Sequence, residues 1–364
     1  MGMGLRLSNE ASEYLMAEAP LQEFREWLTQ NGLYVFTMNG FPYGGFHRTR
    51  VKEQVHAPDW TTPERRSYTL RLFDILQQLL PQGMEGGVST SPLGYRHLYN
   101  TPESAAAARR QATLHIIEVA QELSAIAYRT GKVLHLDIEP EPDGMMETGQ
   151  EFIDWFEQDL LVMGRPFLAG NLSIDESQSE QILRDHIRLC YDVCHFAIGF
   201  EPHEQIITRC SEKGIRIGKI QISAALKASA KTAIAKEAVK EAFRAYDEPV
   251  YLHQVVARTG DGRLLRYPDM SFAIADFDQP GIEQWRAHFH VPVFLEDFGV
   301  LQSTQSEISE VLALQNQRKF TSHLEIETYT WEILPEPLKL PMQESITREL
   351  NWVIEELKKT DSKR

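Results

Sequence analysis

Six short apolar segments of the chain carry a polar side chain at every second position. They are LHLDIEP (134–140), YDVCH (191–195), KIQIS (219–223), YLHQVV (251–256), HFHVPV (288–293) and HLEIET (323–328). Such alternation is typical of β-strands, because successive side chains of a strand point to opposite faces. One face is aliphatic, and the other carries carboxylates and imidazoles. Charged groups are costly to bury alone, so we expect the polar faces to meet one another or a cation.

The stretches between these strands show apolar residues at helical spacing. Helices are predicted at 21–31, 63–80, 102–130, 148–162, 202–213, 225–246, 304–317 and 342–359. Strands are predicted at 33–40, 86–95, 133–139, 189–194, 217–223, 250–256, 287–294 and 322–329. Eight strands interleaved with helices are typical of a parallel (β/α)8 barrel, and we therefore predict this α/β fold.

Two segments lie outside this alternation. The segment 257–276 is predicted to be an insertion that decorates the barrel, and the Gly- and aromatic-rich loop 41–60 is long enough to cover a site. The competing fold is an open doubly wound sheet, which needs a Gly-rich phosphate loop after its first strand. GFPYGG (40–45) lacks the G-x-G-x-x-G spacing of such a loop. We expect one barrel domain over residues 1–364.

Composition narrows the possible function classes. With 364 residues, 42% of them hydrophobic and 24% charged, the chain has the make-up of a globular domain. The formal net charge of −15 disfavours general nucleic-acid binding, which depends on Lys and Arg. The N-terminus is too polar for a signal peptide, and no apolar run is long enough for a membrane span. The three cysteines form no Cys-x-x-Cys pair, so we expect reduced thiols and a cytoplasmic location.

Polar residues at the predicted strand ends are the candidate site, because catalytic groups of a barrel lie at the carboxyl ends of its strands. The predicted metal ligands are Glu139, Asp192, His195, Gln221, His253, His290 and Glu327. Mixed carboxylate, amide and imidazole ligands suit a divalent ion such as Mn²⁺, Mg²⁺, Co²⁺ or Zn²⁺. Such an ion can polarise a carbonyl or lower the pKa of bound water. Glu139 and Glu327 are the candidate bases for proton transfer.

Other polar positions have an ordinary structural interpretation beside the functional one. The deeper residues His135, Asp137, His323 and Glu325 are expected to form buried ion pairs, with Lys219 as the cation. The inward histidines are equally compatible with hydrogen-bonded core residues, and Cys194 with packing. His47, Arg50 and Lys52 in the long loop either clamp an anionic substrate or are solvated. The predicted substrate contacts are Asn39, His47, Lys52, Lys219 and His288.

Eight segments also carry a family resemblance. They are TMNGFPYGGFH (37–47), VKEQVHAPDW (51–60), LDIEPEPDG (136–144), YDVCHFA (191–197), KIQISAALK (219–227), YLHQV (251–255), HFHVPVF (288–294) and SHLEIETYTW (322–331). In these segments, which span nearly the whole chain, the sequence resembles the EboE-like proteins, the metabolite traffic proteins of bacterial Ebo clusters. That resemblance implies a xylose-isomerase-like barrel, the superfamily of sugar isomerases, epimerases and endonuclease IV. It also implies a role in handling secondary-metabolite precursors, with other Ebo-cluster proteins as partners.

The resemblance assigns roles to particular residues. The bridging glutamate of the superfamily falls on Glu139, its D-x-x-H element on Asp192 and His195, and its last-strand Glu-Thr on Glu327 with Thr328. One departure matters: where sugar isomerases usually have a histidine, this chain has Gln221, a weaker neutral ligand. His253 or His290 is then the candidate for the missing imidazole.

Three functions are compatible with these observations. The first is metal-assisted isomerisation or epimerisation of a small polar carbonyl metabolite. The second is metal-dependent hydrolysis of a phosphoester, as in endonuclease IV, which several histidines in a multinuclear site would favour. The third is non-catalytic binding of a metabolite precursor, with the aromatic residues of the loop 41–60 enclosing it. Metal stoichiometry distinguishes them: a single exchangeable ion favours isomerisation, two or three zinc ions favour hydrolysis, and none favours binding.

Overall fold

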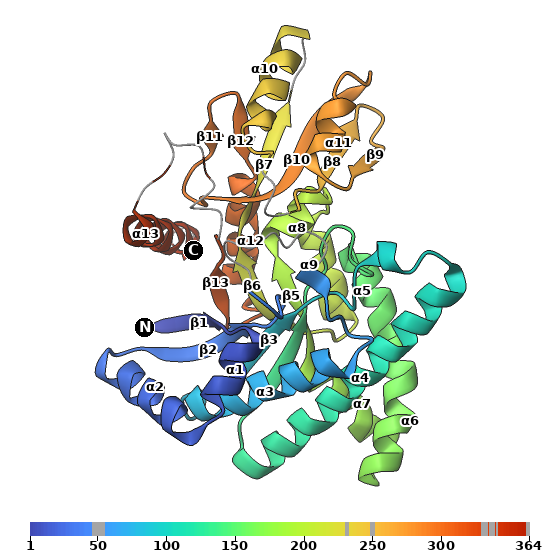
Figure 1. The fold of residues 1–364 in the computed structure, drawn as a ribbon, viewed down its shortest axis with the longest axis vertical. Coiled ribbons are helices and arrows are strands. Elements are labelled where there is room, and N and C mark those ends of the chain that lie inside the picture. The colour runs from blue at the N-terminus through green and yellow to red at the C-terminus, as the bar shows by residue number, and fades with distance from the viewer. Residues whose placement is uncertain are drawn as a thin grey trace.

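A parallel sheet of seven strands forms the lower half of the molecule in Figure 1. The computed structural model describes residues 1–45, 55–229, 233–247, 252–328, 334, 339 and 341–361. Over these residues the sheet has the order β1-β2-β3-β4-β5-β6-β13, and every neighbouring pair is parallel. Its strands are β1 (Gly2–Arg6), β2 (Tyr34–Asn39), β3 (Gly86–Thr90), β4 (Leu134–Ile138), β5 (Ile187–Asp192), β6 (Ile217–Ile222) and β13 (Leu324–Ile326).

Helices follow most of these strands along the chain and cover the outside of the sheet (Figure 1). They are α1 (Asn9–Leu15), α2 (Glu18–Gln30), α3 (Pro63–Leu79), α4 (Pro102–Thr130), α5 (Gly149–Trp155), the π-helical turn η3 (Phe156–Leu160), α6 (Leu161–Leu172), α7 (Glu176–His186), α8 (Val193–Ile198), α9 (His203–Glu212), α12 (Gln305–Arg318) and α13 (Met342–Asp361), with a short 3₁₀ turn η2 (Arg96–Leu98). The aliphatic side of the strands, such as Leu134, Leu136 and Ile138 of β4, is fully buried in the core that these helices complete.

The sheet curves until its first and last strands are neighbours. A side-chain carbon placed on Gly4 of β1 would collide with the carboxylate of Glu325 on β13. Only glycine therefore allows this close approach. The predicted α/β barrel is confirmed as a nearly closed parallel barrel. Its first strand is the short strand β1, which the sequence pattern missed.

A second sheet, which is antiparallel, lies above the barrel in the view of Figure 1. Its strand order is β11-β12-β7-β10-β8-β9. The elements are β7 (Ala224–Ser229), α10 (Ala233–Arg244), β8 (Val255–Thr259), β9 (Leu264–Tyr267), α11 (Met270–Ala275), β10 (Ile282–Val291), β11 (Asp297–Phe298) and β12 (Leu301–Ser303). Among the helices of the described ranges, none combines the length and the apolar character needed to cross a lipid bilayer.

This second sheet corrects three predictions. The predicted barrel strands at 250–256 and 287–294 overlap only in part with β8 and β10, which pair antiparallel with each other outside the barrel. The predicted helix 225–246 begins instead with β7, and the helix α10 starts at Ala233. The reason is physical: alternating polar and apolar residues fit any half-buried strand, parallel or antiparallel. The segment 257–276, predicted to decorate the barrel, contains most of the antiparallel pair β8 and β9 and the helix α11.

Candidate metal centre

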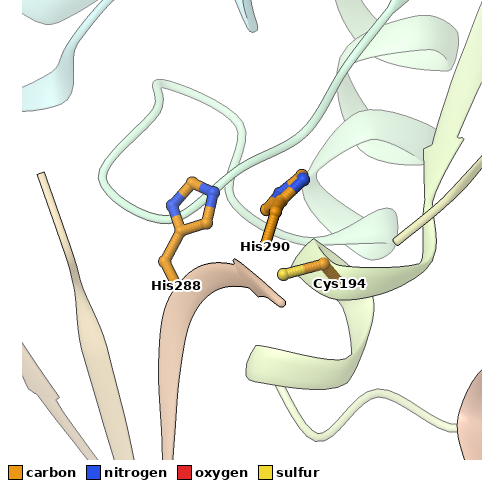
Figure 2. Close-up of side chains that lie close together, drawn as sticks. All are labelled: Cys194, His288 and His290. Atoms are coloured by element: carbon orange, nitrogen blue, oxygen red, sulfur yellow. The ribbon is translucent and has the colours of Figure 1, made fainter. Parts of the chain in front are cut away.

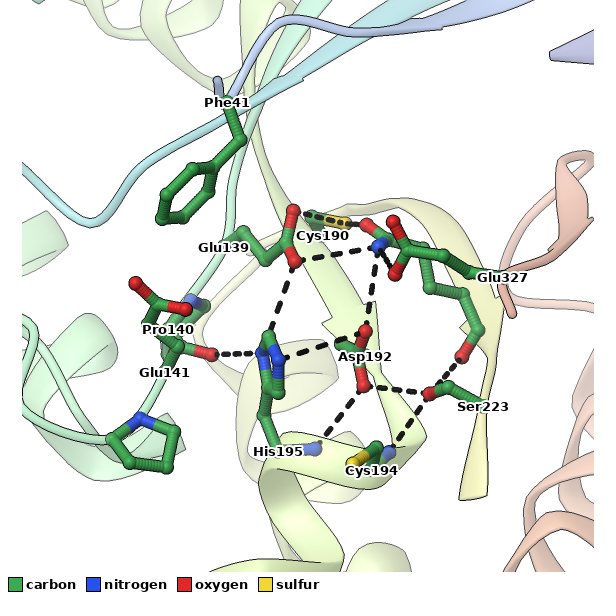
Figure 3. A network of polar contacts seen from close by, with 12 residues as sticks. Phe41, Glu139, Pro140, Glu141, Cys190, Asp192, Cys194, His195, Ser223 and Glu327 are labelled. Atoms are coloured by element: carbon green, nitrogen blue, oxygen red, sulfur yellow. Dashed lines mark hydrogen bonds and ion pairs between the residues drawn. The ribbon is translucent and has the colours of Figure 1, made fainter. Parts of the chain in front are cut away.

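Four polar side chains from four different strands meet at the carboxyl end of the barrel (Figure 3). Glu139 follows β4, Asp192 ends β5, Gln221 lies in β6, and Glu327 follows β13. One carboxylate oxygen of each of Glu139, Asp192 and Glu327 lies within 4.8 Å of the other two. The strand-end carboxylates that the sequence singled out as candidate ligands thus lie together in the structure.

The amide of Gln221 lies at the point where the three carboxylates converge. Its nitrogen is 3.3 Å from Glu139 Oε1 and 3.3 Å from Asp192 Oδ2, and it also contacts Glu327 Oε2. An amide nitrogen has two hydrogens and cannot donate to three carboxylates at once. A positively charged ion at this point would satisfy all three, and the amide oxygen of Gln221 is an additional donor for it.

Burial and crowding raise the pKa of two of these carboxyl groups, Glu139 and Glu327. Burial raises the pKa of Glu139 well above its ordinary value, and the nearby carboxylates of Glu327 and Asp192 raise it further. Burial also raises the pKa of Glu327, with Asp192 adding to the rise and His290 opposing it. Like charges held together in a buried place favour either protonation or a bound cation. The donor set thus fits a divalent metal.

Asp192 links the carboxylates to the histidines. It ends β5 and caps α8, so its Oδ1 accepts from the His195 backbone N–H at 3.1 Å and from Ser223 Oγ at 2.7 Å. The other oxygen, Oδ2, faces the imidazoles: it is 3.9 Å from His195 Nε2 and 4.0 Å from His290 Nε2. The D-x-x-H spacing places His195 one helical turn away, on the same side as Asp192.

Two histidines reach the site from the second sheet. His288 and His290 both lie on β10, and His195 Nε2 is 3.1 Å from His288 Nε2. Burial lowers the pKa of His195 to about 3, with His290 as a further cause, and burial also lowers the pKa of His288 well below its ordinary value. The His195 and His288 rings are therefore neutral near neutral pH, which is the form that binds metals.

Within the described residues, the histidines and carboxylates form overlapping groups. Asp192, His195 and His290 make one, and Glu141, His195 and His288 a second. The third, which Figure 2 shows, is Cys194, His288 and His290, and each group has donor atoms within 4.8 Å of one another. Burial raises the pKa of the Cys194 thiol well above its ordinary value. The three groups share His195, His288 and His290, so the histidines and carboxylates form one continuous set of candidate ligands.

Sequence reasoning missed two members of this centre. Glu141 follows Glu139 in the turn, and burial, with Asp143 and Asp192, raises the pKa of Glu141 well above its ordinary value. His56 lies 3.0 Å from Glu141 and packs against Phe41 and Tyr95. The repeated carboxylate in EPEPDG was the available signal for Glu141, whereas His56 lies in a loop without periodicity.

The remaining predicted site residues lie around the centre or below it. Asn39 donates to Glu327 Oε1 at 2.9 Å and so orients that carboxylate. His253 Nδ1 is 2.8 Å from the His288 carbonyl and its ring stacks on Phe289, so among the described residues it joins none of the close groups. Lys219 pairs with Glu325 one layer deeper, as the sequence predicted for a buried cation. His47, Arg50 and Lys52 lie outside the described residues.

Three solved structures are similar to this one at low sequence identity. The chain is similar to the IolI protein with a bound zinc atom (14% identity over 99% of this chain and 88% of that chain, TM-score 0.45). It is also similar to a xylose isomerase-like TIM barrel protein of Mycobacterium smegmatis in complex with magnesium (11% identity, 95% and 80% covered, TM-score 0.48). A third is the 3-keto-D-glucoside 4-epimerase YcjR of E. coli (16% identity, 75% and 86% covered, TM-score 0.32).

No family model and no curated protein sequence matches the chain. One of these neighbours is described as a xylose isomerase-like TIM barrel protein, and none of these comparisons supports the EboE-like family in particular. At such low identity they say nothing about the reaction of this chain.

A half-buried carboxyl outside the centre, that of Glu201, gives a pH prediction. Burial raises the pKa of Glu201 from 4.5 to about 8, although the Gly149 backbone N–H at 3.0 Å opposes the rise. Between these values the folded chain keeps a proton that the unfolded chain has lost, so the free energy of unfolding falls as pH rises through this interval. In urea unfolding of metal-free protein at about pH 5 and about pH 8, we expect Glu201→Gln to show a smaller decrease than the wild type. Equal decreases would contradict the assignment.

Proposed function

We propose that this chain is a divalent-metal-dependent enzyme that moves a proton beside the carbonyl of a small polar metabolite, as isomerases and epimerases do. The observation that carries the proposal is the pair Glu139 and Glu327. They reach one point from separate strands, and both have raised pKa values. A carboxyl group with a pKa nearer neutrality can both accept and return a proton, which is what a general base and a general acid require.

The other residues of the centre have supporting roles in this proposal. Asn39 holds the carboxylate of Glu327 in a fixed orientation through its amide hydrogen, and the amide oxygen of Gln221 adds a donor to the set. His195, His288 and His290 complete the donor set or bind substrate oxygens. A bound divalent ion supplies Lewis-acid polarisation of the carbonyl. Glu139 then removes the proton from the adjacent carbon, and Glu327 returns one from the other side.

The described ends of the loop 41–60 support an enclosed substrate. Phe41 is 6% exposed and lies over Glu139 in Figure 3, and the His56 ring is packed between Phe41 and Tyr95. Trp60, in contrast, is fully buried and donates to Thr90 Oγ1 at 3.0 Å, so this aromatic residue serves packing. Closure of a loop over a barrel's carboxyl end excludes water from the reaction.

Hydrogen exchange tests the proposal on a panel of candidate substrates. Mn²⁺-loaded protein is incubated in D₂O with aldoses, ketoses and keto-sugars, and NMR follows deuterium entering beside the carbonyl. We expect exchange with at least one compound, and Glu139→Gln and Glu327→Gln should each slow it at least about a hundredfold. The matched control is Glu201→Gln, because Glu201 is a half-buried carboxyl outside the centre. Exchange at the wild-type rate in both site variants would contradict the assigned roles.

A second candidate function, metal-dependent phosphoester hydrolysis, is favoured by one observation. The overlapping groups that share Asp192, His195 and His288 have room for two or more ions, and such pairs of ions stabilise both oxygens of a displacement at phosphorus. Turnover of bis(p-nitrophenyl) phosphate with two or three zinc ions per chain would favour this candidate. One exchangeable ion and no turnover would favour the isomerase.

The resemblance to EboE-like proteins extends the proposal to a secondary-metabolite precursor as the ligand, other Ebo-cluster proteins as partners and the cytoplasm as the location. This part rests on the quoted sequence segments alone, and it includes the alternative of a protein that only binds the precursor. The exchange experiment distinguishes a catalytic role from a binding role, because a protein that only binds the ligand does not exchange the ligand's hydrogens with solvent.

A further inference from the structure

A second group of metal-ligating side chains lies at the opposite, amino-terminal end of the barrel. Glu85 precedes β3, His135 is near the start of β4, and His323 precedes β13. One donor atom of each lies within 4.8 Å of the other two. The two imidazole rings are neighbours, with centroids 5.3 Å apart, and both histidine side chains are nearly or fully inaccessible.

The ring nitrogens in this group are poorly satisfied. Both rings are buried. Within the described residues, three of their nitrogens have no hydrogen-bond partner: Nδ1 and Nε2 of His323, and Nε2 of His135. Unpaired buried polar atoms are costly, and native proteins rarely keep them together without a ligand or water. Burial lowers the pKa of His323 to about 4 and that of His135 well below its ordinary value. Both rings are thus neutral donors.

Asp137 fixes the orientation of His135. Its Oδ1 is 2.7 Å from His135 Nδ1, which leaves Nε2 of the same ring for a ligand. A carboxylate behind a metal-binding histidine is a frequent arrangement, because it sets the tautomer and raises the basicity of the ring. The fold makes room for it: a side-chain carbon on Gly87 or Gly218 would collide with the Asp137 carboxylate.

Two cationic side chains at this end of the barrel are each paired with a carboxylate. Arg188 pairs with one oxygen of Glu85, Oε2, at 3.0 Å, and Lys219 pairs with Glu325. Among the described residues, the hydrogen-bond partner of the Asp137 carboxylate is His135 rather than a Lys or Arg side chain. A pocket of about 850 Å³, lined by Glu85, His323, Phe36 and Tyr34 among others, gives access from solvent.

We propose that Glu85, His135 and His323 form a second metal site, for a Zn²⁺-like ion, at the amino-terminal end of the barrel. Two imidazoles and one carboxylate are a common zinc donor set, and three protein ligands leave a position for water. The ion would tie the last strand, β13, to β4 and to the chain entering β3. Since β13 pairs with β6 over only three residues, this cross-link would stabilise the closed barrel.

Zinc binding in a chain without the upper centre tests this site. In the Asp192→Asn, His288→Gln double variant, which removes a member from each close group at the carboxyl end, we expect about one Zn²⁺ per chain to remain by elemental analysis after dialysis. Adding His323→Gln or His135→Gln to that background should weaken binding at least about tenfold. His186→Gln is the matched control, because His186 is also buried, with Nδ1 at 2.6 Å from the Leu134 carbonyl, but belongs to no close group of the described residues.

Two outcomes would overturn the proposal. One is a double variant that folds by circular dichroism but binds no zinc, and the other is unchanged binding after both histidine substitutions. Should the double variant not fold, the single variants His323→Gln and His186→Gln are compared in the wild-type chain. Only the former should lose one zinc and the zinc-dependent rise in melting temperature. Equal zinc content in these two would equally overturn it.

Discussion

Glu139→Gln and Asp192→Asn are each expected to weaken divalent-metal binding at the carboxyl end of the barrel at least about tenfold, with the far-UV circular dichroism unchanged. Glu139 meets Asp192 and Glu327 in one group, and Asp192 also belongs to the group with His195 and His290. Substitution of Asp192 should therefore have the larger effect. Equilibrium dialysis with Mn²⁺ or Zn²⁺ measures the loss.

The control for this prediction is Glu201→Gln. Glu201 shares the raised pKa of the site carboxyls but accepts its hydrogen bonds from the Gly149 backbone and lies in no close group of the described chain. Its substitution should leave metal binding unchanged. Full metal occupancy in both site variants, or an equal loss in the control, would show that the convergence of these carboxylates does not hold an ion.

The second large effect concerns stability. Glu325→Gln should lower the free energy of unfolding by about 3 kcal/mol or more, because it leaves the fully buried Lys219 without its partner. Burial alone would lower the pKa of Lys219, but Glu325 raises it above the ordinary value, so the pair is charged. Urea unfolding measures the change, and metal binding at the upper centre should persist.

A double substitution separates the loss of the pair from the loss of packing. Lys219→Met together with Glu325→Leu removes both charges and keeps similar volumes, and replacing a buried pair by apolar residues is often neutral or stabilising. We expect the double variant to be more stable than Glu325→Gln alone. If the single variant loses less than about 1 kcal/mol, the pair contributes as little as a surface ion pair.

The upper centre was predictable because strand alternation and strand ends are local properties of a sequence. Glu139, Asp192 and Glu327 each lie at the end of an alternating segment, and parallel strands bring such ends to one edge. The same reasoning identified the buried partner of Glu325 in Lys219. Such local patterns determine the face of a side chain and its height in the barrel.

Sheet membership was not predictable in the same way. His288 and His290 alternate with Phe289 and Val291 as barrel residues would, yet they lie on an antiparallel strand that bends over the barrel. Their place follows from pairing with β7 and β8, which are distant in sequence. The lower group of Glu85, His135 and His323 was likewise hidden, because its members are contributed by three strand beginnings whose closeness depends on barrel closure.

Anomalous X-ray diffraction from crystals grown with Mn²⁺ or Zn²⁺ tests the central claim most directly, because it locates the ion. We predict an anomalous peak among the carboxylate oxygens of Glu139, Asp192 and Glu327, at about 2.0–2.6 Å from each ligand atom, where the Gln221 nitrogen now converges with them. An anomalous map without a peak there, with the Gln221 nitrogen still in its place among the three carboxylates, would contradict it.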